Sequence, residues 1–397
     1  MSNSPKLFIS IGNNVISIIV GRSDELNSLE ILEKLIIPID GIKENKISDL
    51  NKVTNLIKRN ILLIEQKVNY TFKEIILILD NFETSFLNLS GFKRLNGTQI
   101  SKENITYILN SLKSYVEEIE KNKKILHIFN TEYCLDKKKL NNLPIGLFGE
   151  FYTHELSLAL INKNDYKNLE SIFKICNLKI KKTLLESFVK GALINELNSN
   201  IDTFFYVQMS DKKSKIFYIE NNSIKYEQKF NFGTEIILND ICKITSLNND
   251  VVKNIIFENN NMSDISQTEL LEKKFFKDNQ YRKIKKKLIV DVSEARIKEI
   301  SEIIYKKNIN VQNLLNKKKL AFIEIEDKKL SSCFQEIFIK CFTLNDLKKV
   351  RILEKPGLPE MIVAADKVAN YGWIKEVIPV TKRSESLISR IFRTIFD

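Results

Sequence analysis

Short apolar runs alternate with longer stretches of helical spacing at the start of the chain, and this alternation limits the possible folds more than any other feature. The segment Lys6–Val20 reads as two apolar strands joined at a Gly-Asn-Asn sequence, whose residue types suit a tight turn. A strand pattern at Leu29–Pro38 precedes helical spacing at Ser48–Lys67 and a short apolar run at Glu74–Leu79, which is typical of a buried strand. Strands and helices that alternate in this way predict an α/β domain.

A different pattern begins after Asp80 and indicates a small inserted subdomain. Its predicted elements are a strand at Phe82–Leu89, a helix at Ile100–Ile119 that opens on the capping residue Ser101, and strands at Ile125–Cys134 and Phe148–Ile161. The order strand, helix, strand, strand favours an α+β insert. The α/β pattern then resumes with helices at Tyr166–Ile175 and Thr183–Leu197 around a strand at Leu178–Lys181.

Composition excludes several classes of protein. The length of 397 residues allows two or more domains, and 43% hydrophobic with 28% charged residues indicates a folded, soluble protein. No apolar run approaches the roughly 18 to 20 residues of a membrane-spanning helix, and the first residues lack a signal-peptide pattern, so we expect a cytoplasmic protein. Single cysteines and two distant histidines favour neither a metal site nor disulfides.

The net charge of +12 raises the question of a nucleic-acid partner. Its two densest runs are Lys121–Lys124 and Tyr281–Lys287. Neither carries the aromatic pattern of an RNA-binding sheet or a helix-turn-helix signature. We therefore expect no nucleic-acid partner, and the same charge instead favours acidic proteins and, weakly, anionic lipid.

The last fourteen residues, 384–397, form an amphipathic pattern at helical spacing. One half of the helix surface would carry the six large apolar side chains Leu387, Ile388, Ile391, Phe392, Ile395 and Phe396. The other half would carry Arg390 and Arg393. Such a helix either docks on its own domain or lies in a membrane interface, and the residues alone leave both readings open.

Several segments in collinear order resemble the FtsA family of bacterial actin-like cell-division proteins. They are ISIGNNVISIIVG near the start, ISKENITYIL, HIFNTEYCLD, NLPIGLFGEFYTHELSLALI, NLESIFKICNLKI, ESFVKGALI, PGLPE and the amphipathic end. The resemblance implies a two-lobed α/β fold of the actin-like, ribonuclease-H-like type, with an inserted small α+β subdomain and a C-terminal amphipathic helix. The implied parts are 1–81 and 162–200 for the first lobe, 82–161 for an SHS2-like insert, 201–245 for the second lobe, 246–316 for a partner-binding subdomain, 317–376 for the second-lobe return and closing helix, 377–383 for a tether, and 384–397 for a membrane-targeting helix.

The resemblance also implies ATP with magnesium, but the residues that would bind it depart from the family pattern. Ser10 stands where the family has an acidic residue, and Asn13 and Asn14 stand where it has two threonines. The segments 204–218 and 321–330, which correspond to the second phosphate loop and the adenosine loop, contain no glycine. The degraded nucleotide-binding positions are Gly12, Asn13, Asn14 and Gly233. We expect weak or lost ATP binding, no catalytic residue and no bound metal.

Carboxylates in the altered loops do not suggest a replacement chemistry. Asp211 lies among three lysines, which favours a solvated turn. Glu324 and Glu326 alternate with isoleucines, so they share one strand face, and paired carboxylates can transfer protons. Without a nucleophile or glycine loop nearby, a half-exposed strand is the better interpretation.

The family binds the C-terminal tail of the tubulin-like protein FtsZ in its last subdomain, and the resemblance places that site in 246–316. Within it, 248–265 reads as irregular, and a basic turn leads into a long helix. The expected contacts to the acidic tail are Arg282, Lys283, Lys286 and Arg296. An ordinary surface helix with lysines on its wet face remains the alternative.

The function that the resemblance implies is a non-catalytic adaptor that tethers the FtsZ ring to the cytoplasmic face of the cell membrane at the division site. The expected partners are the FtsZ tail, anionic lipid and further copies of the chain. The resemblance also allows other division proteins as partners. Two alternatives stay open, namely an active actin-like ATPase and an actin-like scaffold of a pilus-type assembly.

Overall fold

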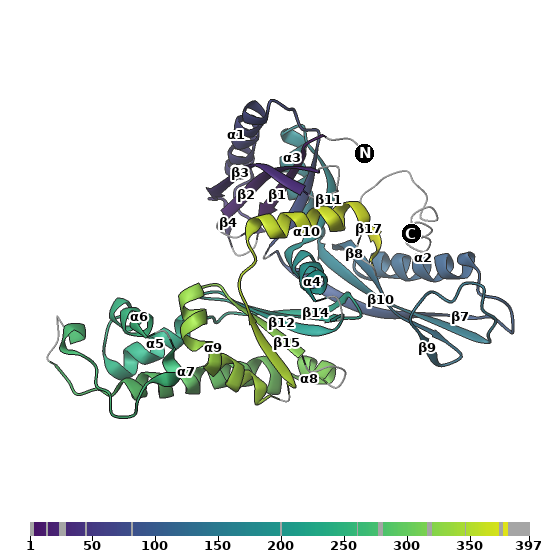
Figure 1. Cartoon of the computed structure of the whole chain (residues 1–397). Helices are drawn as coiled ribbons and strands as arrows, with labels where there is room; N and C mark the ends of the chain where they lie inside the picture. The colour runs from purple at the N-terminus through teal and green to yellow at the C-terminus, as the bar shows by residue number, and fades with distance from the viewer. Residues whose placement is uncertain are drawn as a thin grey trace. The chain divides into compact units, whose positions relative to one another are not determined.

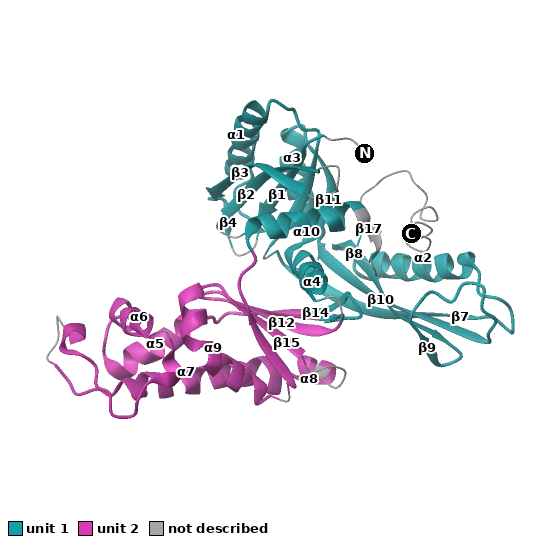
Figure 2. Cartoon of the chain, in the orientation of Figure 1, with its two compact units in different colours: residues 1–202, 219–226, 357–397 teal, residues 203–218, 227–356 magenta. Residues whose placement is uncertain are grey.

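The computed structural model describes residues 4–12, 15–23, 29–43, 46–80, 82–198, 201–259, 261–276, 281–315, 320–345, 347–372 and 376–379. The predicted amphipathic helix at 384–397 and positions 13 and 14 lie outside the described residues. The chain divides into two compact units (Figure 2). The first unit comprises Met1–Asp202, Ile219–Tyr226 and Gly357–Asp397, and the second comprises Thr203–Tyr218 and Glu227–Pro356.

The first unit is built on a mixed sheet in the order β11-β6-β1-β2-β3 (Figure 1). Its strands are β1 (Lys6–Ile11), β2 (Val15–Ser23), β3 (Leu29–Pro38), β6 (Glu74–Leu79) and β11 (Lys179–Leu185), and a separate two-stranded pair joins β4 (Ile42–Lys43) to β5 (Lys46–Ile47). The hairpin of β1 and β2 is antiparallel, whereas β1, β6 and β11 are parallel. The predicted hairpin and the predicted bounds of β3 and β6 are confirmed.

Four helices complete this part of the first unit: α1 (Leu50–Val68), α3 (Lys163–Ile175), α4 (Glu186–Leu197) and α10 (Leu358–Tyr371). The predicted start of α4 at Thr183 is wrong, because Thr183–Leu185 continue the parallel pairing of β11 with β6. The predicted place of the closing helix α10 in the second lobe also differs from the structure. This helix packs against α4 in the first unit, where its Asp366 pairs with Lys6 at 2.9 Å.

The insert forms a second sheet in the order β17-β8-β10-β7, to which β9 adds along part of β8. Its elements are β7 (Thr84–Arg94), α2 (Lys102–Ile119), β8 (Lys123–Leu135), β9 (Lys138–Leu140), β10 (Phe151–Asn162) and β17 (Glu376–Pro379). Helix α2 begins at a capping box of Ser101 and Asn104, as the sequence predicted for Ser101. It covers one face of the sheet closely, since a Cβ on Gly91 would lie 2.4 Å from Cγ2 of Ile108.

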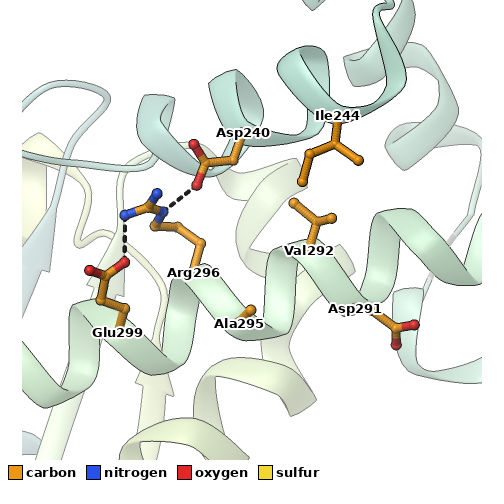
Figure 3. A pocket seen from close by; sticks show the side chains of 7 residues that line it. All are labelled: Asp240, Ile244, Asp291, Val292, Ala295, Arg296 and Glu299. Atoms are coloured by element: carbon orange, nitrogen blue, oxygen red, sulfur yellow. Dashed lines mark hydrogen bonds and ion pairs between the residues drawn. The ribbon is translucent and has the colours of Figure 1, made fainter.

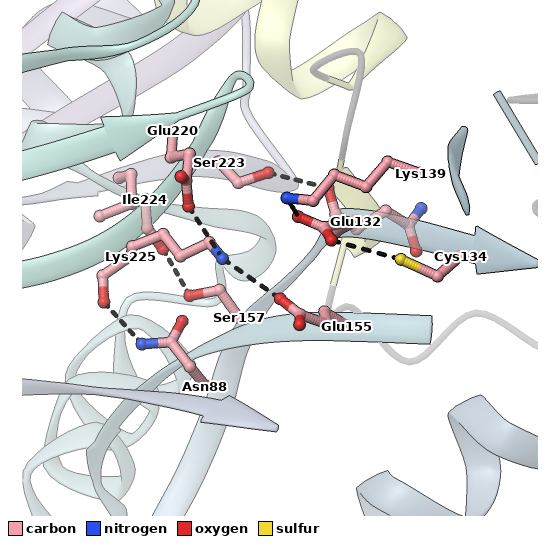
Figure 4. A network of polar contacts seen from close by, with 11 residues as sticks. Asn88, Glu132, Cys134, Lys139, Glu155, Ser157, Glu220, Ser223, Ile224 and Lys225 are labelled. Carbon is pink, nitrogen blue, oxygen red and sulfur yellow. Dashed lines mark hydrogen bonds and ion pairs between the residues drawn. The ribbon is translucent and has the colours of Figure 1, made fainter. Parts of the chain in front are cut away.

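The tip of a long hairpin covers part of the other face of the insert sheet. This hairpin joins β13 (Ser214–Glu220) to β14 (Ser223–Phe230), and its tip Ile219–Tyr226 belongs to the first unit. The hydroxyl of Ser157 donates to the carbonyl of Ile224 at 2.5 Å, and that of Ser223 donates to the carbonyl of Asn130 at 2.9 Å (Figure 4). Side chain to backbone hydrogen bonds thus fix the tip on the sheet.

The chain re-enters the insert sheet near its C-terminus. Strand β17 pairs with β8 in antiparallel register, from Glu376 opposite Phe129 to Pro379 opposite His127. Residues 377–379, which we predicted as the start of a tether, therefore belong to a strand. The rest of the predicted tether, 380–383, lies outside the described residues.

The second unit combines a sheet in the order β14-β13-β12-β15-β16 with a set of helices. The further strands are β12 (Phe204–Met209), β15 (Leu320–Ile325) and β16 (Lys349–Leu353). The helices are α5 (Glu235–Thr245), α6 (Asn249–Glu258), α7 (Lys286–Ser301), α8 (Ile309–Leu315) and α9 (Lys328–Thr343), with 3₁₀ turns at Met262–Asp264 and Lys273–Phe276 and a π-helical turn at Glu302–Lys306. Helix α7 packs against both α5 and α9 (Figure 1).

The predicted irregular segment at 248–265 is wrong for its first part. The side chain of Asn248 accepts a hydrogen bond from the amide of Val251, so this asparagine caps α6. The helix then buries Val252, Ile255 and Ile256 at helical spacing. No helix among the described residues is long and apolar enough to cross a membrane.

Candidate functional site

The first candidate phosphate loop lies at the end of β1. The amide of Gly12 donates to the carbonyl of Val15 at 3.0 Å, and the amide of Asp80 donates to the carbonyl of Ile11 at 3.0 Å. A Cβ on Gly12 would lie 3.5 Å from the Val15 oxygen and 3.6 Å from Oδ2 of Asp80, which is ordinary contact distance. Packing within the first unit therefore does not require a glycine at this position.

The second candidate phosphate loop is the short turn between β12 and β13. The amide of Thr234 donates to the carbonyl of Ser210 at 3.0 Å, and the amide of Glu235 donates to that of Asp211 at 2.9 Å. A Cβ on Gly233 would lie only 2.1 Å from the Ser210 oxygen. The close approach of the turn to the start of α5 accounts for this glycine, and two amides at the helix start already have protein acceptors.

The segment 321–330, which corresponds to the adenosine loop, ends at the start of α9. A side chain of the same segment accepts the hydrogen bonds of the first amides of this helix. The carboxylate of Asp327 accepts from the amides of Lys329 at 2.9 Å and Leu330 at 3.1 Å, so it caps α9. A helix start normally attracts anions through such amides. At α9 the carboxylate of Asp327 already accepts the hydrogen bonds of two of these amides.

Glu324 in β15 and Glu326 just after it have different surroundings, and the predicted half-exposed strand is wrong. Glu324 is fully buried and accepts a hydrogen bond from the hydroxyl of Tyr206. Glu326 follows the strand and pairs at the surface with Lys355 at 2.6 Å. Among the described residues no group of His, Cys, Asp and Glu is placed to hold a metal ion.

A groove of about 330 Å³ lies between α5 and α7 in the second unit (Figure 3). Its lining residues are Asp240, Ile244, Asp291, Val292, Ala295, Arg296 and Glu299. Ile244 and Val292 face one another across the groove (Figure 3), and Ile244 is 54% exposed. An apolar floor thus meets solvent between two helices, which is the shape that accepts apolar side chains of a bound peptide.

Arg296 lies at one end of this groove and already has two carboxylate partners. Its Nε donates to Asp240 and its Nη1 donates to Glu299 at 2.5 Å (Figure 3). The hydrogen bond to Asp240 raises the pKa of the Arg296 guanidinium above its ordinary value. A peptide carboxylate that binds Arg296 would have to replace one of these partners.

The other three predicted contacts lie at or just before the start of α7. Arg282 donates to the carbonyl of Thr245 at 2.5 Å and so satisfies the C-terminal end of α5. Lys286 pairs with Glu269 and is largely buried, whereas Lys283 is exposed. The structure therefore brings the basic turn to the Ile244 end of the groove, because Thr245 is the neighbour of Ile244.

Sequence reasoning missed the apolar floor of the groove. Ile244 lies outside the buried stripe of α5, whose apolar members are Ile237, Leu238 and Ile241. A large apolar residue on the wet face of an amphipathic helix was the available signal. Its partner Val292 comes from α7, and only the packing of the two helices shows that they meet.

Comparison with known proteins agrees with this architecture. No protein-family model matches the chain. Curated relatives named "Cell division protein FtsA" include two from Buchnera aphidicola. One, from the subspecies Acyrthosiphon pisum, is 22% identical over 70% of this chain and 66% of its own length, and one from Schizaphis graminum is 21% identical over 80% and 76%. The protein of that name from Escherichia coli K12 is 20% identical over 44% of this chain and 41% of its own length.

A solved structure described as "PilM-PilN type IV pilus biogenesis complex" aligns with a TM-score of 0.56 at 8% identity, over 94% of this chain and 99% of that one. At this identity the likeness shows the fold, which is that of the actin-like ATPases. The sequence relatives and the fold together confirm the resemblance. The chain is therefore similar in sequence to the FtsA cell-division proteins, at low identity, and has an actin-like fold.

Proposed function

We propose that the chain is a non-catalytic cell-division adaptor that binds the C-terminal tail of FtsZ and holds it at the cytoplasmic face of the membrane. The names of the curated relatives support a role in cell division. The observation that carries the adaptor role is the groove between α5 and α7, with its apolar floor and with the basic turn of Arg282 and Lys283 near its Ile244 end. The matched segments cover about two thirds of the first relative, so the partners are inferred from this chain's own residues.

An acidic, amphipathic peptide fits the groove in one orientation. Its apolar side chains would pack on Ile244 and Val292, as amphipathic helices do in apolar grooves. Its carboxylates would lie towards the basic turn, where Lys283 is exposed and the start of α7 adds a favourable dipole. Arg296 can contribute to peptide binding only if a peptide carboxylate replaces Asp240 or Glu299 as its hydrogen-bond partner.

The helix starts of the second unit support the absence of catalysis. Nucleotide phosphates bind where helix N-terminal amides are free to donate. At α5 two such amides donate to the carbonyls of Ser210 and Asp211, and at α9 two donate to Asp327. Micromolar, magnesium-dependent ATP binding in an isothermal titration would overturn this part of the proposal and favour the ATPase alternative.

The membrane contact of the proposal rests on the sequence of 384–397. Burial of six apolar side chains at roughly 1.5 kcal/mol each yields at most about 9 kcal/mol before ordering costs are subtracted. One such helix should bind reversibly. Durable attachment then requires several copies in one assembly, which self-association would supply through avidity.

The peptide site is tested by fluorescence anisotropy with a labelled peptide of the C-terminal tail of FtsZ from the same organism. We expect Val292→Glu to abolish binding and Lys283→Glu to weaken it about tenfold, with a loss of salt dependence. The matched control is Ile309→Ser, since Ile309 is 74% exposed on α8 of the same unit and lies outside the groove. Unchanged affinity of Val292→Glu would remove the assignment.

The membrane contact is tested by flotation of the full chain with anionic vesicles. We expect the double substitution Phe392→Glu with Ile395→Glu to release most of the protein. Flotation equal to that of the unsubstituted chain would contradict anchoring by the tail. The pilus-type alternative gains no support from the likeness to the pilus complex, because that likeness shows the fold alone.

A further inference from the structure

One face of the insert sheet carries an exposed pair of aromatic side chains. Phe92 on β7 lies opposite Thr153 on β10, and Phe151 lies opposite Arg94. Residues that face each other across antiparallel strands, and alternate residues along a strand, share one face. The rings of Phe92 and Phe151 stack with centroids 5.4 Å apart, and 66% and 43% of these residues are exposed.

This face is opposite to the one that α2 covers. Gly91 and Tyr152, the sequence neighbours of the two phenylalanines, face α2 and the buried core of the insert. Further along β10, Ser157 meets the hairpin tip, and Glu155 lies 3.7 Å from Lys225, which also pairs with Glu220 (Figure 4). The hairpin tip thus covers the sheet at Glu155 and Ser157, and the aromatic pair lies further towards the start of β10.

Two exposed basic side chains lie near the aromatic pair. Arg94 is on the same face, and Lys137 is at the neighbouring turn between β8 and β9. The nearby carboxylate of Glu132 pairs with Lys139 at 2.5 Å. Oδ1 of Asp136 accepts hydrogen bonds from the amides of Glu150 and Phe151, and Asp136 and Glu150 are exposed acidic residues at this end of the sheet.

We propose that Phe92 and Phe151 form a second lipid contact, in which the rings enter the interface of an anionic bilayer and Arg94 and Lys137 meet its headgroups. Aromatic rings and basic side chains on one surface are the combination that interfacial membrane contacts use. Anionic lipid contributes about fivefold in partition for each well-placed basic residue. The inference rests on the proposed function and adds the second signal that a weak helix needs for stable attachment.

The tail and this face can reach the same bilayer. Strand β17 pairs with β8 at Phe129, and the segment of β8 from there to Cys134, which faces Thr153, spans roughly 17 Å. The eighteen residues that follow Pro379 in the sequence could span at most about 60 Å if extended. The length of chain therefore permits both contacts at once.

The test measures partition of the full chain onto vesicles of phosphatidylcholine with 30% phosphatidylglycerol. Four proteins are compared: the unsubstituted chain, Phe92→Ser with Phe151→Ser, Phe392→Glu with Ile395→Glu, and all four substitutions together. We expect the Phe92 and Phe151 substitutions to lower partition about tenfold. The tail variant should retain weak binding, and either added salt or the further substitution of Phe92 and Phe151 should remove it. Leu197→Ser is the matched control, because Leu197 is 74% exposed on α4 of the same unit.

A second measurement does not depend on loss of binding. We expect Phe92→Trp to show blue-shifted emission and quenching by brominated acyl chains on vesicles, after subtraction of the signal from the single native tryptophan. The inference is overturned if the Phe92 and Phe151 substitutions leave partition unchanged in both tail backgrounds, or if Phe92→Trp stays unquenched. It is also overturned if those substitutions change only the oligomeric state in light scattering, which would assign the face to a second copy. Tail anchoring fails separately, if the tail variant partitions like the unsubstituted chain.

Discussion

The carboxylate of Glu376 lies 3.0 Å from the ammonium of Lys182, and both side chains are almost completely buried. Nδ1 of His127 lies 2.9 Å from the other carboxylate oxygen. Burial alone would raise the pKa of Glu376, but the charge of Lys182 and the hydrogen bond from His127 outweigh it and lower this pKa to about 2. The pair joins β17 to β11 and so fixes the last described strand to the sheet of the first unit.

Glu376→Gln should destabilise the protein by about 3 to 5 kcal/mol, because it leaves the Lys182 charge buried without a counter-ion. Urea unfolding followed by circular dichroism measures the loss. Glu326→Gln is the control, since the Glu326 pair with Lys355 is half exposed and should contribute less than about 1 kcal/mol. Equal effects of the two substitutions would contradict a structural role for the buried pair.

The same carboxylate predicts an acid-sensitive stability. Its pKa falls from 4.5 in the unfolded chain to about 2 in the folded protein, so the folded state binds the proton more weakly. The resulting stabilisation of about 3 kcal/mol is fully present above pH 4.5 and is lost as the pH falls from 4.5 towards 2. The free energy of unfolding, measured against pH, should therefore fall less steeply in this window for Glu376→Gln than for the unsubstituted chain. Parallel curves would show that Glu376 does not carry the effect.

Two glycines at the candidate phosphate loops, Gly12 and Gly233, should respond differently to alanine. Gly233→Ala would place its Cβ 2.1 Å from the Ser210 oxygen, so we expect a loss of at least about 2 kcal/mol in the free energy of unfolding. Gly12→Ala meets only ordinary contacts and should cost less than about 1 kcal/mol. Thermal unfolding of both variants without nucleotide measures this difference. Comparable losses would mean that the turn at Ser210 can move away from α5.

The local patterns of the sequence were sufficient for most elements of the fold. The bounds of β3 and β6 follow from short apolar runs, and Ser101 marked the start of α2 because a capping residue acts on its own helix. The errors arose where tertiary pairing decides the state. Thr183 carries a helical pattern, yet its backbone pairs in parallel with β6.

The candidate site was less predictable, because its parts come from different elements. The basic turn before α7 was visible in the sequence, but the partners of Arg296 and Lys286 were not. The prediction for Glu324 was wrong for the same reason. Alternation along β15 suggested an exposed face, but the carboxylate is buried and accepts a hydrogen bond from Tyr206. Contacts between distant segments have no signature in a single sequence.

Two buried tyrosines of the second unit offer a further test of packing. Tyr305 lies edge-on to Phe205 and Phe342, and within the described structure its hydroxyl has no hydrogen-bond partner. Burial raises the pKa of Tyr305 far above its ordinary value, so the hydroxyl stays protonated and unsatisfied. Tyr305→Phe keeps the ring contacts and removes this buried polar group, and we expect it to stabilise the protein by about 1 kcal/mol.

Tyr206→Phe is the matched comparison, because the Tyr206 hydroxyl donates to the buried carboxylate of Glu324. Its loss should destabilise the protein by about 1 to 3 kcal/mol, since a buried acceptor would lose a donor. Urea midpoints of the two variants should therefore move in opposite directions. A destabilised Tyr305→Phe would mean that a water molecule or a rearranged side chain satisfies the hydroxyl in solution, because only the loss of such a bond turns this substitution unfavourable.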